Sequence, residues 1–334
     1  MRRSLLLSLL LASAACPGRY RPSPAAPVTA AGRGVEDAAL PYAWVDARTG
    51  RAVTDSELWT AVGAARAVCI GEEHPNPHHH WAQLTIVGAA ATKITGKRLA
   101  LGMEMVQAPF QGVLDDWSAH KIDDPALLSR TGWADRWGYD FALYRPILDQ
   151  ARANGMALVA LNAPRELVKA VAKLGVDGIS AAERAKLPAL VLDDAQHRAW
   201  FDALMAGMEH GGGHGQTEAP ATKPDDETGA GTAAVPPAAP SADNIYAAQV
   251  VWDESMAEHA RRWLGEGGDT IVIIAGTGHC HDSAIVRRLV RRGGGPALSI
   301  RPIIDDGEGN VARALAEATN DYLFVMTMPK PSPR

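Results

Sequence analysis

The chain has 334 residues, of which 47% are hydrophobic, and it carries a formal net charge of -5 at pH 7 with a pI near 6.1. This length and apolar content predict a globular protein with a sizeable core. The acidic balance and the scattered basic residues give no electrostatic reason to expect nucleic acid as a partner.

The N-terminus has the pattern of a secretory signal peptide over residues 1–16. Two arginines precede a short apolar segment, residues 4–11, that is too short to span a bilayer permanently. Cys16, directly after small residues, is typical of a bacterial lipoprotein cleavage site, although Ser13 stands where a branched aliphatic residue is usual. We therefore expect an exported protein anchored by lipid at Cys16 in the bacterial outer membrane, with ordinary signal cleavage as the alternative. Residues 17–40, rich in Pro, Ala and Gly, would form a flexible tether.

Four short apolar runs predict the central strands. They cover residues 67–70, 99–103, 157–161 and 270–275. Short apolar runs bounded by Gly and Pro are typical of strands buried on both faces of a mainly parallel sheet. Strands and helical patterns alternate along the chain, so we predict an α/β fold in which helices flank a mainly parallel sheet.

Helical patterns fill the gaps between these runs. Crossover helices are predicted over residues 55–62, from about 77 onward, over 107–120 and over 144–154. Residues 180–208 and 245–264 have helical patterns without intervening strands, and residues 180–264 are expected to form a cap over the open end of the sheet. Within the cap, residues 211–243 have almost no large apolar side chains, which predicts a disordered insert. The α/β domain is expected over residues 41–305. A short C-terminal extension, 306–334, would include one helix and an edge strand at 322–326.

Acid, amide and histidine side chains follow the predicted strands. They are Glu72, His74, Glu104, Asn162 and His279. In parallel sheets ligands bind beyond the carboxyl ends of the strands, so these residues are expected to converge on one site. Two carboxylates and two histidines can bind a divalent metal and leave positions for water. The same set can carry out metal-free acid/base chemistry, whereas the simplest alternative is that each residue only caps a helix or satisfies a backbone donor.

The run from His78 to His80 is less specific than it looks. Consecutive helical residues point about 100° apart, so at most two of the three can face the site. Two prolines separate His74 from His78, which excludes the paired histidines of a zinc protease helix.

Two further features suggest a flat, anionic ligand. Arg165 could clamp a carboxylate or propionate, or it could pair with Glu166 or Asp177. The aromatic stretch over residues 132–144 is interrupted by Gly and polar residues, as an exposed platform for a flat ligand would be, with core packing as the alternative. Within this stretch, Tyr139 or Tyr144 could ligate ferric iron through its phenolate. These are the two tyrosines that we consider as ligands of haem iron.

The remaining cysteines and the late arginines receive structural interpretations. Cys69 is expected to be a small core residue, and Cys280 lies between two histidines without a metal-binding spacing, so no disulfide framework is predicted. The arginines of residues 287–292 are expected on the solvated face of a helix.

Five ordered motifs carry a resemblance to a known family. They are Gly-Glu-Glu-His-Pro-Asn-Pro at 71–77, Leu-Gly-Met-Glu-Met at 101–105, Leu-Asn-Ala-Pro-Arg-Glu at 161–166, Trp-Asp-Glu-Ser-Met-Ala at 252–257 and Gly-Thr-Gly-His at 276–279. Together they resemble the ChaN-like haem-binding uptake family, which belongs with the Tiki and erythromycin-esterase proteins in a wider superfamily. The resemblance implies an exported, often lipid-anchored bacterial protein of haem or iron uptake. It also implies that Glu72, His74, Glu104 and His279 are the superfamily's shared positions, which serve hydrolysis in some relatives, including metal-dependent proteolysis in the Tiki group.

Two hypotheses of function follow, and whether the protein is an enzyme stays open. The first is a haem-binding lipoprotein in which the cofactor contacts are made by Tyr139, Tyr144, Asn162, Arg165 and His78. The second is a hydrolase, with or without a divalent metal, that uses the four shared acid and histidine positions. Haem or another small molecule is the expected partner, and a homodimer is left open.

Overall fold

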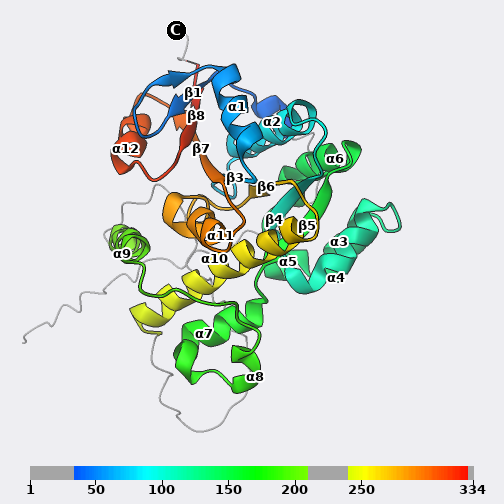
Figure 1. Ribbon diagram of the computed structural model, residues 1–334, viewed down its shortest axis with the longest axis vertical. Coiled ribbons are helices and arrows are strands. Elements are labelled where there is room, and N and C mark those ends of the chain that lie inside the picture. The colour runs from blue at the N-terminus through cyan, green and yellow to red at the C-terminus, as the bar shows by residue number, and fades with distance from the viewer. Residues whose placement is uncertain (1–33, 210–239, 330–334) are drawn as a thin grey trace, which may run out of the picture. The chain divides into compact units, whose positions relative to one another are not determined.

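The computed structural model describes residues 34–209 and 240–329, and within them eight strands form one sheet in the order β2-β1-β8-β7-β3-β6-β4-β5 (Figure 1). The strands are β1 (Tyr42–Asp46), β2 (Ala52–Val53), β3 (Ala67–Ile70), β4 (Leu99–Gln107), β5 (Ala157–Asn162), β6 (Thr270–Ile274), β7 (Ala297–Asp305) and β8 (Tyr322–Thr327). All neighbours from β8 to β5 pair in parallel, whereas β1 is antiparallel to β2 and β8. The predicted α/β fold with a mainly parallel sheet is confirmed.

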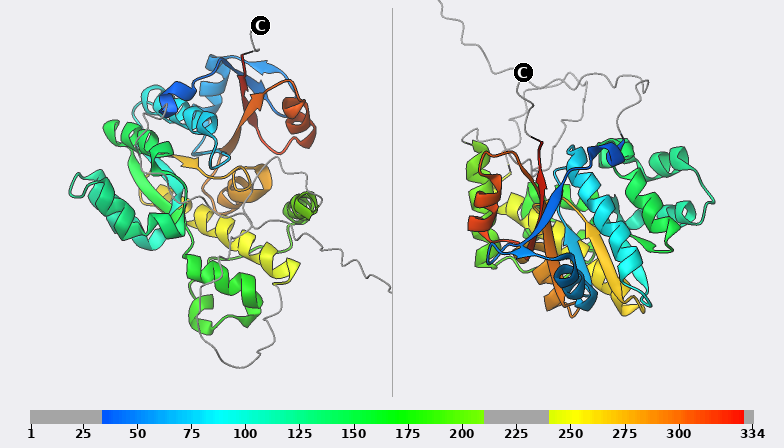
Figure 2. Two further views of the ribbon diagram at one scale, coloured as in Figure 1. Left: turned by 180° about the vertical axis from the view of Figure 1, so that it is seen from behind. Right: turned by 90° about the horizontal axis from the view of Figure 1, so that it is seen from above.

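Helices lie on both sides of the strands (Figure 2). The α-helices are α1 (Asp55–Ala64), α2 (Pro77–Lys93), α3 (Gln111–Ser118), α4 (Asp124–Thr131), α5 (Trp133–Arg136), α6 (Arg145–Ala153), α7 (Arg165–Gly178), α8 (Ala181–Arg184), α9 (Ala195–Glu209), α10 (Ala242–Gly265), α11 (Arg287–Arg291) and α12 (Asn310–Glu317). Shorter turns are η1 (Val35–Ala38), η2 (Ala108–Phe110), η3 (Phe141–Leu143) and η4 (Asp282–Val286). The predicted crossover helices are present, with ends that differ by a few residues.

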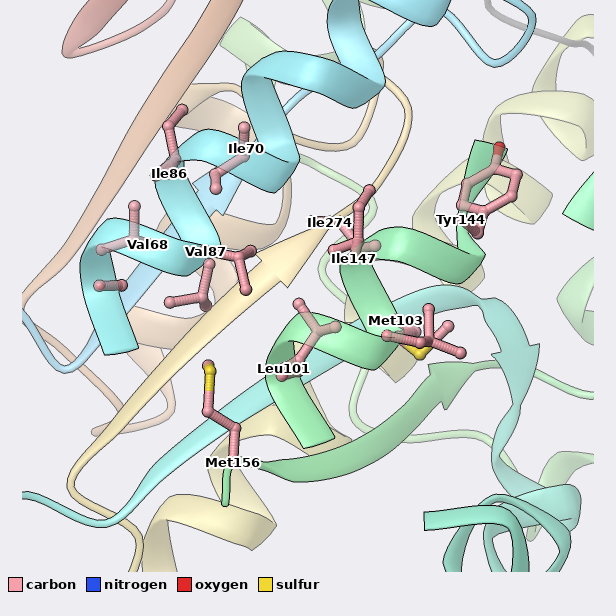
Figure 3. Close-up of a cluster of buried hydrophobic side chains, with 14 of the residues drawn as sticks. Val68, Ile70, Ile86, Val87, Leu101, Met103, Tyr144, Ile147, Met156 and Ile274 are labelled. Carbon is pink, nitrogen blue, oxygen red and sulfur yellow. The ribbon is translucent and has the colours of Figure 1, made fainter. Parts of the chain in front are cut away.

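Alternation along the central strands builds a core on each face of the sheet. On β3, Val68 and Ile70 face a core shared with α1, α2, α3 and α6, whereas Ala67 and Cys69 face α10 and the segment around α11. Figure 3 shows the first of these cores, with Ile86 of α2 and Ile147 of α6 among its side chains. The central strands are therefore buried on both faces, as their apolar sequences predict.

Local capping fixes where the helices near the site begin. The Thr54 side chain accepts from the backbone N of Glu57, so Thr54 caps α1. The Asn76 side chain accepts from the backbone N of His78, and Pro77 occupies the first turn of α2. This cap sets the direction of the chain directly after the first predicted site loop.

The C-terminal part of the sheet differs from expectation. β8 lies between β1 and β7, so it is not an edge strand, and the sheet continues beyond residue 305. β7 was not predicted, because Arg301 and Pro302 interrupt its apolar pattern. Residues 306–329 are consequently part of the domain rather than an extension of it.

The expected cap is only partly separate from the sheet. α10 begins at Ala242 and packs its C-terminal half, including Met256 and Trp263, against the face of the sheet. η1 packs against α2 through buried Val35 and Ala38, so the expected tether ends before residue 35. The signal peptide, Cys16, the rest of the tether and most of the 211–243 insert lie outside the described residues. None of the helices in the described part of the chain combines the length and apolar character that crossing a membrane requires.

A disulfide joins Cys69 to Cys280 and corrects the prediction for both cysteines. Cys69 lies on β3 and Cys280 lies in the loop after β6, which is the neighbouring strand. Both residues are buried in the core on the α10 face. A sequence separation of 211 residues concealed the pair, because only the sheet order makes them neighbours.

Candidate functional site

Three neighbouring strands bring the predicted acid and histidine residues together. Glu72 and His74 follow β3, His279 follows β6, and Glu104 lies near the end of β4, which is next in the sheet. The register between β4 and β5 shifts between Met103 and Gln107, so Glu104 occupies an irregular stretch of strand. Such irregularities redirect side chains next to functional sites. We call Glu72, His74, Glu104 and His279 the acid–histidine cluster.

Glu72 is the centre of one half of the acid–histidine cluster. Its Oε1 accepts from His74 Nδ1 and from the hydroxyl of Tyr144, each at 2.8 Å. Its Oε2 lies 3.5 Å from His80 Nδ1, and the Glu72 side chain is fully buried. Burial alone would raise the pKa of Glu72, but His80 and the hydrogen bond from His74 hold this pKa below its usual value. Glu72 is therefore an ionised, buried carboxylate at neutral pH.

His279 is the centre of the other half and lies between two carboxylates. Its Nδ1 donates to Asp253 Oδ1 at 2.6 Å, and its Nε2 lies 3.3 Å from Glu104 Oε1. Burial alone would lower the pKa of His279, but the charges of Glu104 and Asp253 raise it to about 10. Glu104 keeps a lowered pKa despite burial because His279 faces it. The cluster thus holds a buried imidazolium between carboxylates.

The glycine-rich loop after β6 connects the Glu72 half and the His279 half of the acid–histidine cluster through backbone hydrogen bonds. The backbone N of Gly276 donates to Glu104 Oε2 at 2.7 Å, and that of Thr277 donates to the carbonyl of Glu72 at 2.9 Å. A Cβ atom on Gly276 would lie 3.0 Å from His74 Cε1 and 3.2 Å from its Nε2. Such a contact is tighter than most packed side chains make, so glycine lets the His74 ring approach this loop closely.

Asp253 is a site residue that the sequence interpretation did not assign. It is fully buried on α10, and its Oδ2 lies 3.1 Å from His197 Nε2 and 3.8 Å from Arg288 Nη1. Burial would raise the pKa of Asp253, but Arg288, His197 and His279 lower it strongly. The available signal was its place in the Trp-Asp-Glu motif, where two consecutive acids follow the apolar run at 250–252.

Three other predicted site residues lie outside the acid–histidine cluster. Asn162 Nδ2 donates to the backbone carbonyl of Glu104 at 2.9 Å, which ties the end of β5 to β4. Arg165 Nη1 donates to the carbonyl of Asp135 at 2.6 Å, and its predicted partner Glu166 instead pairs with Arg136. His78 Nδ1 donates to the carbonyl of Ala38 at 2.7 Å, on the side of α2 that meets η1. Of the histidine run, His80 is the member that reaches Glu72.

The aromatic stretch packs as part of the fold rather than as an exposed platform. Trp133 and Tyr144 are buried, while Trp137 and Tyr139 are half-buried. The rings of Trp137 and Tyr139 lie 4.7 and 4.8 Å from the His74 ring, and Trp133 Nε1 donates to the Tyr139 carbonyl. Burial and the Glu72 charge raise the pKa of Tyr144 well above its usual value. Mutual edge-to-face packing explains the difference from the prediction.

Two of the four arginines of residues 287–292 depart from the prediction, whereas Arg287 and Arg291 are partly exposed. Arg288 is 1% exposed and Arg292 is largely buried, so they do not form a solvated face. Both pair with Glu254, which follows Asp253 on α10 and has a fully buried side chain. The buried carboxylate attracts these guanidinium groups into the protein.

The structure gives no support to the metal hypothesis. No group of three or more His, Cys, Asp or Glu side chains within residues 34–209 and 240–329 is arranged to hold a metal ion. The carboxylates of the acid–histidine cluster are paired with imidazoles and backbone N–H groups instead. This arrangement favours charge stabilisation and proton transfer as the chemistry of the cluster.

This geometry defines an α/β protein with a buried acid–histidine cluster at the carboxyl edge of a mainly parallel sheet. The family described as haem-binding uptake, Tiki superfamily, ChaN, matches residues 58–289, which include every residue of the cluster. The match spans more than half of the 334 residues, so the chain belongs to this family.

Solved structures are similar to this chain, and the first of them shares its fold. The structure described as cofacial heme binding to ChaN of Campylobacter jejuni is 13% identical, covers 85% of this chain and 96% of that chain, and has a TM-score of 0.59. A mutant of the erythromycin esterase EreC in its open conformation is 14% identical over 87% of this chain and 84% of that chain, with a TM-score of 0.42. The comparison with curated proteins finds no match.

Proposed function

We propose that this protein binds haem as an exported, lipid-anchored component of haem or iron uptake. The observation that carries the proposal is the family match over residues 58–289, which covers the central strands and both halves of the acid–histidine cluster. The ChaN structure with which the fold is shared is described as binding heme.

Two features of this chain support export and anchoring. The N-terminal pattern ends in Cys16 after small residues, as in bacterial lipoproteins. The buried Cys69–Cys280 disulfide is typical of proteins that fold in an oxidising compartment outside the cytoplasm. We expect wild-type protein in the membrane fraction and a Cys16→Ser variant in the soluble envelope fraction. Equal distribution of the two proteins would remove the lipid anchor from the proposal.

The acid–histidine cluster itself is a poor fit for haem. Tyr144 donates its hydroxyl to Glu72 and has a strongly raised pKa, which opposes the phenolate that iron would need. Tyr139 is half-buried beside His74 and is the better of the two expected tyrosine ligands. When bound, haem would supply its ferric iron and two propionates, while this chain would supply an axial ligand and cationic partners.

A hemin titration of the full-length protein followed in the Soret region tests the proposal. We expect a saturable shift with a stoichiometric end point, against a control of the same protein unfolded in urea. A linear, non-saturating change identical to the control would reject haem binding. Tyr139→Phe and Tyr144→Phe then test the two tyrosines separately, and we expect no spectral change for Tyr144→Phe.

The second candidate function is acid/base hydrolysis without a metal, and the arrangement of the cluster favours it. A carboxylate paired with an imidazole occurs twice, as Glu72 with His74 and as Glu104 with His279. A buried carboxylate can take a proton from water while a neighbouring imidazolium gives one to the leaving group, so that water is added across the bond.

A screen of carboxylic ester substrates with the metal-free protein tests this function. We expect Glu72→Gln to lower any activity by about 100-fold or more, the usual contribution of a general base. Glu166→Gln is the matched control, since Glu166 is exposed. Activity that persists in Glu72→Gln, or that requires an added divalent metal, would contradict this mechanism.

A further inference from the structure

A histidine on α9 is buried behind Asp253. His197 is fully buried, and Phe201, one turn further along the helix, packs in an apolar cluster with Tyr246 and Val250. An imidazole buried at such a position costs free energy unless its nitrogens find partners. The partners of His197 therefore indicate why a histidine, and not an apolar residue, stands there.

The Asp253 carboxylate is divided between two histidines. Its Oδ1 accepts from His279 Nδ1 at 2.6 Å, and its Oδ2 lies 3.1 Å from His197 Nε2. Within the described part of the chain, His197 Nε2 and Asp253 Oδ2 have no other hydrogen-bond partner, although both are buried. Arg288 Nη1 lies farther from Oδ2, at 3.8 Å. His197 is therefore the closer of the two groups that can hold this oxygen.

The surroundings of His197 place its proton on the nitrogen that faces Asp253. Its Nδ1 lies 3.2 Å from Arg288 Nη2 and 3.2 Å from the Tyr246 hydroxyl. A guanidinium can only donate, so Nδ1 must accept and Nε2 carries the N–H group. The N–H of His197 is thus on the side of Asp253 Oδ2.

Packing holds the His197 ring in this orientation. The ring is nearly parallel to those of Trp200 and His281, with centroids 5.6 and 5.9 Å away and interplanar angles of 22° and 18°. Burial lowers the pKa of His281 to about 3, so it brings no positive charge beside His197. At the start of α9, Asp194 accepts from the backbone N of His197 at 3.1 Å. The helix therefore presents the imidazole to Asp253 in a fixed position.

We propose that His197 is a positioning residue of the acid–histidine cluster, which holds Asp253 Oδ2 so that Oδ1 of the same carboxylate faces His279. The inference rests on the proposed acid/base function, in which the imidazolium gives a proton to the leaving group. An acid that orients an imidazole is effective only when its own carboxylate is held in place. α9 thus joins β3, β4, β6 and α10 among the elements that build the site.

Two substitutions of His197 separate positioning from packing. His197→Gln keeps an amide N–H near the position of Nε2, whereas His197→Leu fills a similar space without a donor. In the leucine variant the Asp253 carboxylate can turn toward Arg288, which weakens its hydrogen bond to His279. We expect the pKa of His279 to fall by about 1 pH unit or more, as when other close charge contacts are loosened. The glutamine variant should retain the wild-type pKa of His279.

NMR titration of the His279 ring in the full-length protein measures these values, with His279→Gln to assign the resonance. Phe201→Leu is the packing control, since Phe201 is buried on the same helix against Tyr246 and Val250. We expect it to destabilise the protein and to leave the pKa of His279 unchanged. Should His197→Leu not fold by circular dichroism, His197→Asn, whose side chain is one methylene shorter than that of Gln, takes its place.

Kinetics give a second measurement if the ester screen finds a substrate. His197→Leu should lower kcat by about tenfold or more and leave KM nearly unchanged, because His197 lies behind Asp253 and contacts no substrate. His197→Gln should restore most of the lost kcat.

The outcomes separate this inference from the function on which it rests. An unchanged pKa of His279 in His197→Leu, or an equal fall in the leucine and glutamine variants, would overturn the positioning role whether or not the protein hydrolyses esters. A fall in His197→Leu alone, in a protein that hydrolyses no ester, would support the positioning role and reject hydrolysis.

Discussion

At the scale of single residues, the structure predicts that His279 carries a positive charge at neutral pH. Its two ring nitrogens face Asp253 and Glu104, so the imidazolium is stabilised within the protein. The charge of Glu104 makes the largest contribution to the raised pKa of His279, and Asp253 adds a short hydrogen bond, 2.6 Å from Nδ1. We expect Asp253→Asn to lower the pKa of His279, by about 1–3 pH units as for other close charge pairs. NMR titration of the His279 ring measures this change, and an unaltered titration midpoint would show that Asp253 does not set the charge.

The same imidazolium makes stability depend on pH. The pKa of His279 is about 10 in the folded protein and about 6.5 in the unfolded chain, so the folded protein binds the proton more tightly. Its stabilisation is therefore complete below pH 6.5 and is lost as the pH rises toward 10. We expect the free energy of unfolding to fall by up to about 1.4 kcal/mol per pH unit across this interval. Urea unfolding at pH 6.5, 8 and 9.5 measures the slope, which His279→Gln should flatten.

Gly276 offers a matched test of close packing at the acid–histidine cluster. Gly276→Ala would place a Cβ 3.0 Å from His74 Cε1, and we expect a loss of about 1–3 kcal/mol from overpacking. Gly63→Ala is the control, since nothing lies within 4 Å of its added Cβ on α1 and the helix should gain about 0.5–1 kcal/mol. Denaturant unfolding of both variants checks the opposite signs. A Gly276→Ala protein as stable as the wild type would show that the loop can move away from His74.

At the scale of elements, α10 serves two buried networks through adjacent residues. Asp253 and Glu254 are consecutive and so point about 100° apart on the helix. The Asp253 carboxylate pairs with His279, whereas the Glu254 carboxylate pairs with Arg288 and Arg292. One helix therefore couples the acid–histidine cluster to the arginines around α11.

Glu254→Gln tests the second of these networks. Arg288 is 1% exposed and would lose the charge of a principal partner, so we expect a destabilisation of about 3–5 kcal/mol, as for other broken buried pairs. Glu266→Gln, at the exposed C-terminal end of α10, should change stability by less than about 0.5 kcal/mol. Thermal and urea unfolding measure both. A loss of less than 1 kcal/mol in Glu254→Gln would mean that the neighbouring carboxylates compensate.

Strands that are uniformly apolar could be predicted from the sequence, and those that are interrupted could not. Four central strands were found within a few residues of their observed ends, because burial on both faces leaves continuous apolar runs. β7 was not predicted, because Arg301 and Pro302 interrupt its apolar pattern. Without β7, the strand at β8 was expected to lie at an edge of the sheet, whereas it lies between β1 and β7. The predicted convergence of Glu72, Glu104 and His279 followed from strand ends alone. The contact between Asp253 and His279 could not be predicted in this way, because Asp253 lies on α10, a helix that packs against the face of the sheet.

At the scale of the whole molecule, the disulfide ties the two halves of the acid–histidine cluster. Cys69 lies three residues before Glu72, and Cys280 directly follows His279. We expect replacement of both cysteines by alanine to cost about 2–5 kcal/mol, the usual range for removal of a native disulfide. Urea unfolding with and without reductant measures the loss, and Cys16→Ser is the control. Equal stability of the double variant and the wild type would mean that packing alone holds the two loops.

The same bond has a consequence for the order in which the chain matures. Cys69 is synthesised 211 residues before Cys280, and in that interval Cys16 is the only other thiol on the chain. Three cysteines allow three pairings, of which one is native. A lipid attached to the Cys16 sulfur would block the two pairings that involve Cys16. The native pairing of Cys69 with Cys280 would then be the one disulfide that these three cysteines can form.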